Sequence, residues 1–372
     1  MKFKLDDEQQ MLQDSVRRFL DKAYTFEARV AARKGGASAG NWQAFADNGW
    51  LAAAIPEAYG GLGGSIVDTV LIAQAFGRSL VVEPFLGCAV LAAQTFLVGA
   101  GAAQREALLP ALADGSQLLA LAYSEPQARG NPAVVAARAE AIGPGFVLSG
   151  CKTLVLGGVS ADRYLVSAAI AGTPGVSLFL VDKASPGLQV RALPLHDGSE
   201  AAELVLGAVP ASLVGVAGNG LQALRHGLSH AVAALCAELV GAMEAAIDMT
   251  ADYLKIRQQF GVAIGSFQAL QHRLVDMAAE MELSRSMLYA LLASLENDGT
   301  AQQEVVVSQA KSLIGRLAKS VCGQAIQLHG GIGMTDEYVV GHYFKRAVVA
   351  DVLFGSSDQH DAACAAAHQP VR

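Results

Sequence analysis

The sequence is poor in charge, in aromatic residues and in paired cysteines. Of its 372 residues 16% are charged and 6% are aromatic, and the net charge is −7. No basic stripe is available to neutralise phosphates, which argues against nucleic-acid binding. The cysteines form no C-x-x-C pair and have no metal-ligand spacing, so we expect no metal site and reduced, mostly buried thiols in a cytoplasmic protein. They are Cys88, Cys151, Cys236, Cys322 and Cys364.

Long apolar runs are also scarce. The first eight residues mix charged and apolar side chains, so we expect no signal peptide and no export. One uncharged stretch, residues 86–104, is close to the length of a membrane-spanning helix. Because it contains Gln94, Thr95, Gly99 and Gly101, we expect a buried helix and no membrane span.

The length and the apolar pattern predict three domains. A chain of 372 residues is too long for one core, and its 52% apolar content is rich in alanine, which suits packed helices. We expect an α+β fold, mainly α. It has an N-terminal helical domain (1–118), a middle β-domain (119–212) and a C-terminal four-helix bundle (213–372). The predicted strands lie around 146–148, 164–166, 176–181 and 188–193, and the predicted bundle stripe is Leu270, Leu274, Met277, Met281, Leu288 and Leu291.

A glycine motif closes the predicted helix that ends near residue 328. It reads Gln327, Leu328, His329, Gly330 and Gly331. Two glycines let the backbone approach a phosphate-bearing ligand closely. Alone, the pair is more typical of an ordinary helix stop, because glycine is common just past a helix end.

A second motif joins two predicted C-terminal helices, with Arg257, Phe260 and Gly261 followed by Phe267 and Gln268. An arginine offers a fixed fork of donors to a pyrophosphate, and an aromatic ring can stack on adenine. A solvated loop between helices would explain Arg257 alone equally well.

A third motif is the glycine-rich stretch Ile55–Gly64, with Pro56-Glu57-x-Tyr59-Gly60-Gly61-Leu62-Gly63. Together the three motifs resemble the acyl-CoA dehydrogenase family over essentially the whole chain. The resemblance implies that FAD lies extended across a subunit interface. The neighbouring subunit's arginine, phenylalanine and glutamine motifs then hold the adenine and pyrophosphate. It also implies that Gly355 and Ser356 belong to the cofactor site.

The chain departs from the family pattern where the flavin ring would lie. Instead of T-E-P-x-A-G-S-D it has Ser124–Asn131, without the last serine and aspartate. In the family strand G-x-K-x-W-I-T, Leu154 replaces the aromatic residue and Leu156 the hydroxyl, and leucine cannot donate that hydrogen bond. Lys345-Arg346 replaces the family's usual Arg-Asp after the glycine motif.

The catalytic base is the largest departure. The family removes a proton α to a thioester with a glutamate, and Phe354 stands at that position. Some members carry the glutamate on the first bundle helix, near Ala231 here. Neither side chain accepts a proton, and a positioned base contributes ~10²–10⁴-fold in rate. We therefore expect no catalytic residue at either place.

Two hypotheses follow from the resemblance. The chain is a non-catalytic subunit that helps hold FAD for a catalytic acyl-CoA dehydrogenase partner, as in the α2β2 enzymes of bacterial steroid side-chain degradation. Alternatively it is a self-sufficient acyl-CoA flavoenzyme, as a homo-oligomer with a relocated base. Candidates for that base are His230, Glu238 and Asp351, each of which has a structural explanation as a cap, an ion-pair partner or a solvated side chain.

Overall fold

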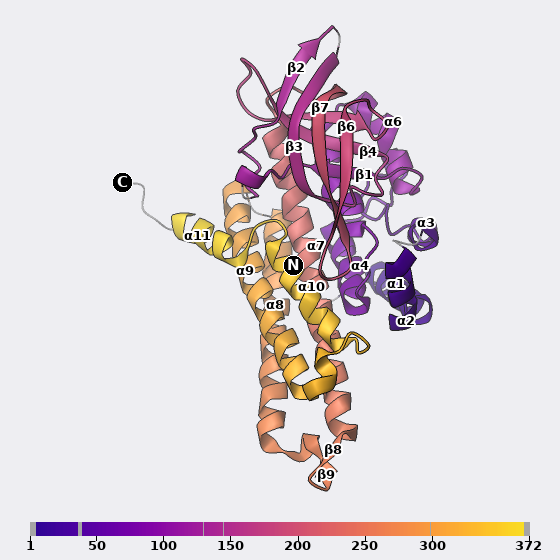
Figure 1. Ribbon diagram of the computed structural model, residues 1–372, viewed down its shortest axis with the longest axis vertical. Helices are drawn as coiled ribbons and strands as arrows, with labels where there is room; N and C mark the ends of the chain where they lie inside the picture. Colours follow the sequence, from indigo (N-terminus) through magenta and orange to yellow (C-terminus); the bar gives the residue numbers. More distant parts are fainter. Residues whose placement is uncertain (1–4, 36–38, 129, 144, 298, 368–372) are drawn as a thin grey trace. The chain divides into compact units, whose positions relative to one another are not determined.

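The computed structural model describes residues 5–35, 39–128, 130–143, 145–297 and 299–367. They form two compact units, one of residues 1–34, 70–81 and 232–372 and the other of residues 35–69 and 82–231. Two helices, Ile66–Ser79 (α4) and Gly220–Ile256 (α7), run from one unit into the other. The fold is mostly helical with a β-structure in the middle of the chain, as predicted (Figure 1). The three domain boundaries stay a prediction.

The N-terminal part is helical, as its spacing predicted. Asp6 caps the first helix with a capping box to Gln9, and Val16 and Leu20 form its buried face. The elements here are α1 (Asp7–Ala23), α2 (Phe26–Gly35), α3 (Ala39–Asp47), the 3₁₀ turn η1 (Glu57–Tyr59), α4, η2 (Phe85–Ala92), α5 (Ala93–Gly99) and α6 (Ala102–Ala113).

The uncharged stretch 86–104 is not a single helix. It begins as the π-helix η2, continues as α5, and breaks at Ala100 and Gly101 before α6. The described residues include one helix long and apolar enough to cross a membrane, which is α7. Its most apolar window is 83% buried inside the fold, as expected of a core helix.

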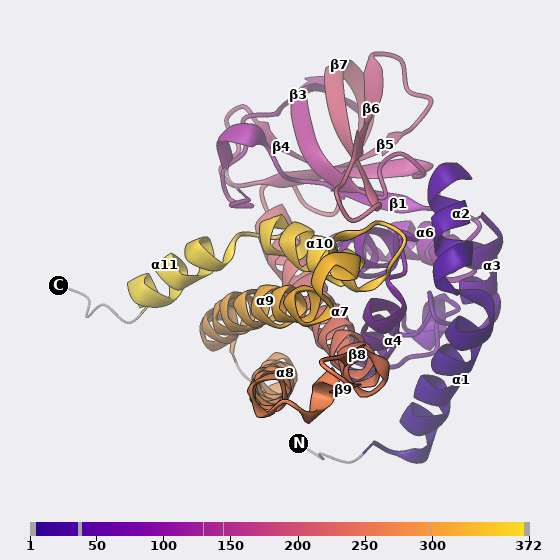
Figure 2. The same ribbon diagram turned by 60° about the horizontal axis from the view of Figure 1, so that its bottom comes forward.

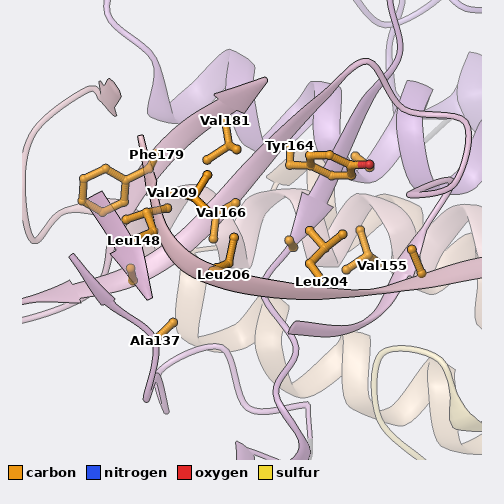
Figure 3. Close-up of a cluster of buried hydrophobic side chains, with 14 of the residues drawn as sticks. Ala137, Leu148, Val155, Tyr164, Val166, Phe179, Val181, Leu204, Leu206 and Val209 are labelled. Atoms are coloured by element: carbon orange, nitrogen blue, oxygen red, sulfur yellow. The ribbon is translucent and has the colours of Figure 1, made fainter. Parts of the chain in front are cut away.

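The strands of the second unit close into a ring. β4 pairs with β2 and β5, β5 with β7, β7 with β3, and β3 with β2, while β1 extends from β4 and β6 from β7. Alternate side chains therefore fill a common interior, where Leu148, Tyr164, Phe179 and Leu204 are fully buried (Figure 3). The strands are β1 (Leu119–Ala122), β2 (Arg138–Ile142), β3 (Gly145–Leu156), β4 (Arg163–Ile170), β5 (Ser177–Asp182), β6 (Leu188–Pro194) and β7 (Glu200–Val214).

The C-terminal helices α7, α8, α9 and α10 run up and down beside one another from residue 232 onward (Figures 1 and 2). Four of the six residues of the predicted stripe on α8 are core, since Met277, Met281, Leu288 and Leu291 are buried. Its first two members, Leu270 and Leu274, are only half-buried because the first turns of α8 project from the bundle. The elements are α7, β8 (Gln258–Gln259), β9 (Val262–Ala263), η4 (Ile264–Ser266), α8 (Gln268–Asn297), α9 (Thr300–His329), η5 (Gly330–Met334), α10 (Val340–Val352) and α11 (Ser357–Ala367).

Candidate functional site

The arginine turn, residues 257–268, is a small hairpin rather than a loop. β8 and β9 pair, and Phe260 and Gly261 form the tip with φ of 54° and 80°. Two left-handed residues make the tip that a tight hairpin favours, but phenylalanine there is strained. The Phe260 ring is also 92% exposed. The ring meets Phe267 edge-on at 6.2 Å but stays exposed, and turn chemistry favours another residue here, so such strain is typical of a ligand site.

Two polar side chains of the arginine turn, those of Arg257 and Gln268, are free to contact a ligand, whereas Gln259 and Ser266 donate to carbonyls of the turn. The backbone of Arg257 is fixed, because its N–H donates to Tyr253 O at 2.9 Å and its carbonyl accepts from Ile264 at 2.8 Å. Its guanidinium is exposed and forms no ion pair within the described part of the chain. Gln268, the first residue of α8, is exposed as well. This arrangement suits a pyrophosphate and its ribose.

The glycine loop, residues 327–333, comprises the last three residues of α9 and most of the 3₁₀ turn η5. Gly330 has φ of 65° and its N–H donates to Gln327 O, so a helix stop accounts for it. Gly331 has an ordinary φ, and a Cβ added there would have nothing within 4 Å. No internal contact requires a glycine at that position. The open backbone with the exposed Gln327 therefore fits a phosphate-bearing group such as FAD.

Ring stacking brings the glycine loop to the arginine turn. The imidazole of His329 stacks on Tyr253 at 4.5 Å and packs at an angle on Tyr338 at 5.1 Å. Tyr253 lies one helical turn before Arg257, so the two motifs meet at one end of the bundle (Figure 1). The side chains of Leu328 and His329 are buried and face inward.

The loop around Phe354 lies at the opposite end of α10, which spans roughly 20 Å. Phe354 is half-buried with φ of 61°, and its carbonyl accepts from His360 Nε2 at 3.0 Å. Buried Lys311 donates to Gly355 O at 2.9 Å. Ser356 caps α11 by exchanging hydrogen bonds with Gln359. Gly355 and Ser356 are thus firmly held, but they do not join the arginine turn.

Two of the three candidate bases are engaged in ion pairs. Glu238 is 7% exposed and pairs with Arg346, one of the two residues that replace the family's Arg-Asp. Asp351 is not solvated, because it is half-buried and pairs with Lys319 at 2.8 Å. Burial opposes its ionisation, yet the hydrogen bonds from Lys319 and Ser357 lower the pKa of Asp351. Neither carboxylate is available as a base.

His230 differs from them, because one of its nitrogens stays open. Its Nδ1 donates to His226 O at 3.0 Å, so Nε2 carries the lone pair. Nε2 makes no hydrogen bond within the described residues. Burial, and the neighbouring His226 ring at 4.1 Å, lower the pKa of His230 to about 4. The imidazole is therefore neutral at pH 7, but it is a weak base.

A buried ion pair supports the loop Ser124–Asn131, which lies in the unit of residues 35–69 and 82–231. Glu125 accepts from Lys152 Nζ at 2.6 Å and from the N–H groups of Ala136 and Ala137, and Lys152 also donates to Ser167 at 2.9 Å. Burial opposes the ionisation of Glu125, but these donors lower its pKa. All partners are satisfied, so the loop is rigidly anchored on β3. Arg129 lies outside the described residues.

The end of β3 carries apolar side chains where the family pattern has an aromatic residue and a hydroxyl. Leu154 is half-buried in a left-handed conformation with φ of 52°. Leu156 is 9% exposed and packs on η2. A Cβ added to Gly87 of η2 would lie 2.7 Å from the Cβ of Leu156. Neither leucine can donate a hydrogen bond to a flavin.

Three family models cover nearly all of the chain. "Acyl-CoA dehydrogenase, N-terminal domain" matches residues 6–116, the middle domain matches residues 120–209 and the C-terminal domain matches residues 218–367. The chain belongs to the acyl-CoA dehydrogenase family. Members of this family are FAD-binding flavoproteins, which agrees with the open arginine turn and glycine loop.

Full-length relatives support the same assignment. The chain is 29% identical to acryloyl-CoA reductase (NADH) of Anaerotignum propionicum, over 97% of this chain and 94% of the relative. It is 30% identical to the mitochondrial 2-methylacyl-CoA dehydrogenase of Solanum tuberosum, over 95% and 89%. Among solved structures, the Tcur3481–Tcur3483 steroid ACAD shares 31% identity with a TM-score of 0.87, and 97% of each chain is covered.

Three structural features of these sites were not predicted from the sequence. The hairpin at Phe260 could have been found from the pair Phe260-Gly261, since glycine at the second position is a turn signal. The Glu125–Lys152 pair spans 27 residues, and nothing in the local sequence joins its members. The stacked His226 and His230 were visible as an i, i+4 pair on a helix.

Proposed function

We propose that this acyl-CoA dehydrogenase family chain is the supporting subunit of a heteromeric enzyme. The observation that carries the proposal is that Phe354 and Ala231 occupy both positions at which the family places its base. The ion pairs of Glu238 and Asp351 remove two of the three replacements. A general base and a complete flavin site then come from a catalytic partner chain.

In this proposal the chain holds one end of FAD. Arg257 binds the pyrophosphate, Phe260 contacts the adenine, and Gln268 binds a ribose or phosphate oxygen. The glycine loop, with Gln327, Gly330 and Gly331, lets the backbone approach the same end of the cofactor. Gly355 and Ser356 belong to the opposite end of α10 and would meet a different part of the extended cofactor. When bound, FAD supplies the hydride acceptor for dehydrogenation of an acyl-CoA thioester.

The expected assembly is an α2β2 heterotetramer with a catalytic acyl-CoA dehydrogenase. The Tcur3481–Tcur3483 steroid ACAD, similar over 97% of this chain, carries a two-part name and is named for steroids. This likeness supports a two-chain assembly and a steroid side-chain or fatty acyl-CoA substrate. A cytoplasmic location is consistent with all five cysteines being free.

Substituting Arg257→Ala in the assembled complex tests the proposal. Loss of one charge-assisted contact to phosphate costs ~1.5–3 kcal/mol, which corresponds to roughly 10- to 150-fold weaker FAD binding. FAD affinity is measured by fluorescence titration of the stripped complex. Arg273→Ala removes an exposed arginine of α8 and serves as the matched control. Equal affinity in both variants would show that FAD is held elsewhere.

A second candidate function rests on the open Nε2 of His230. With its own FAD, a homo-oligomer could use this imidazole as the base for α-proton removal. His230→Gln keeps a polar side chain but removes the basic nitrogen. If the unaccompanied chain reduces its flavin on addition of butyryl-CoA and His230→Gln does not, the self-sufficient enzyme replaces the supporting subunit.

A further inference from the structure

His329 has an unusual environment for a residue of a ligand-binding loop. It is 3% exposed, and its Nδ1 donates to Ala325 O at 2.7 Å within α9. Its Nε2 therefore keeps a lone pair, yet this atom is sealed from solvent and has no hydrogen-bond partner in the described part of the chain. A buried acceptor without a donor is costly, so another contribution must favour histidine or its ring at this place.

The ring lies between two tyrosines that belong to different motifs. Tyr253 leads directly into the arginine turn, because Arg257 N–H donates to its carbonyl at 2.9 Å. Tyr338 comes from the segment that follows the glycine loop. That segment is itself fixed, since His342 Nε2 donates to Asp336 O at 3.0 Å. Three rings in contact, one pair stacked and one pair tilted, thus connect the end of α7, the end of α9 and the segment before α10.

Gly333, the last residue of the glycine loop, packs directly on the last turn of α9, which carries His329. A Cβ added at Gly333 would lie 3.1 Å from His329 Cβ and 2.7 Å from Ile326 O. Only a glycine lets η5 fold back so closely onto the last turn of α9. The position of the open Gly331 backbone therefore depends on where the last turn of α9, which carries His329, is held.

We propose that His329 is a positioning residue whose ring holds the glycine loop in register with the arginine turn, without itself touching FAD. The inference rests on the proposed function, in which these two segments bind the same end of FAD. The sealed Nε2 excludes a direct contact with a ligand outside the fold. The contacts with Tyr253 and Tyr338 are made by the aromatic ring of His329, so we expect the ring and not its nitrogens to position the loop.

Three substitutions separate the ring from its nitrogens. His329→Phe keeps a flat ring and removes both nitrogens, His329→Gln keeps polar atoms without a ring, and His329→Ala removes both. FAD dissociation constants are measured on the stripped assembly that carries FAD, well below the lowest melting temperature of the set. His196→Phe alters an exposed histidine and serves as the control. We expect His329→Phe within about 3-fold of wild type, and His329→Gln and His329→Ala weaker by about 10-fold or more.

The outcomes are distinct. Retained FAD affinity in His329→Gln together with a loss in His329→Phe would show that a hydrogen bond matters, and would overturn the proposal. Wild-type affinity in all three variants, or an equal loss in His329→Phe and His329→Gln, would also overturn it. If His329→Ala does not fold, the comparison of Phe with Gln still decides. Failure of the proposed function is seen separately, because Arg257→Ala would then leave FAD affinity unchanged.

Discussion

The arginine turn and glycine loop can be compared with the loop Ser124–Asn131 and the end of β3. In the first region polar and aromatic groups reach solvent, as the guanidinium of Arg257 does, and as the Phe260 ring does with an edge contact to Phe267. In the second region the internal partners are complete, as for Glu125 and Lys152, while the groups that would meet a flavin are leucines. One region has kept its means of contacting a ligand, and the other has kept only its support.

This difference shows that the buried hydrogen bonds that hold a loop and the exposed groups that would contact a ligand are separable within one fold. In a buried ion pair such as Glu125–Lys152 each charge needs the other, whether or not the loop above the pair binds anything. An exposed, strained phenylalanine is not needed for folding at all. Strained or unsatisfied groups therefore locate function in this chain better than well-satisfied ones.

We expect the largest change in stability when the buried ion pair under the loop Ser124–Asn131 is broken. Lys152→Met leaves Glu125 buried without its counter-ion, which should lower the free energy of unfolding by ~3–5 kcal/mol. Urea unfolding measures this. Lys183→Met, which alters an exposed lysine of the same unit that donates to Val159 O, should cost about 1 kcal/mol or less. Equal losses in the two variants would mean that the buried pair is not the anchor of the loop.

Phe354→Glu tests whether a carboxylate at this position is enough for dehydrogenation by this chain. We expect no acyl-CoA-dependent flavin reduction, because Leu154 and Leu156 cannot hold a flavin. We also expect a loss of about 1–3 kcal/mol in unfolding free energy, because a charge replaces a half-buried ring. Phe354→Leu, which stays apolar, should lose less. Restored flavin reduction at unchanged stability would show a site that lacks only its base.

The smallest effect has the opposite sign. Phe260→Asn places a residue that tolerates φ above zero at the hairpin tip, so it should raise the free energy of unfolding by ~0.5–1 kcal/mol. FAD affinity of the assembly should fall in the same variant. Phe267→Asn changes the neighbouring ring at an ordinary φ of −77° and should bring no gain in stability. A Phe260→Asn protein that is less stable would show that this ring packs in the free chain.

Much of the fold could be predicted from the sequence, because the local spacing of apolar residues distinguishes its helices from its strands. Val16 and Leu20 are buried at helical spacing, and Leu148 and Phe179 are buried at strand spacing. The closure of the strands into a ring could not be predicted, because it depends on pairs such as β4 with β2, distant in sequence. The roles of Phe354 and Arg257 are predictions from the resemblance. The ion pair of Asp351 with Lys319 could not be predicted, because it needs the packing of α9 on α10.

The flavin content of this chain, alone and together with the acyl-CoA dehydrogenase encoded nearest to it, tests the central claim most directly. Flavin absorbance is compared with protein concentration in both preparations. We expect little or no FAD on the chain alone, because Leu154 and Leu156 cannot donate to a flavin, and close to one FAD per pair of chains in the complex. A yellow preparation of the chain alone with one FAD per chain would contradict the account.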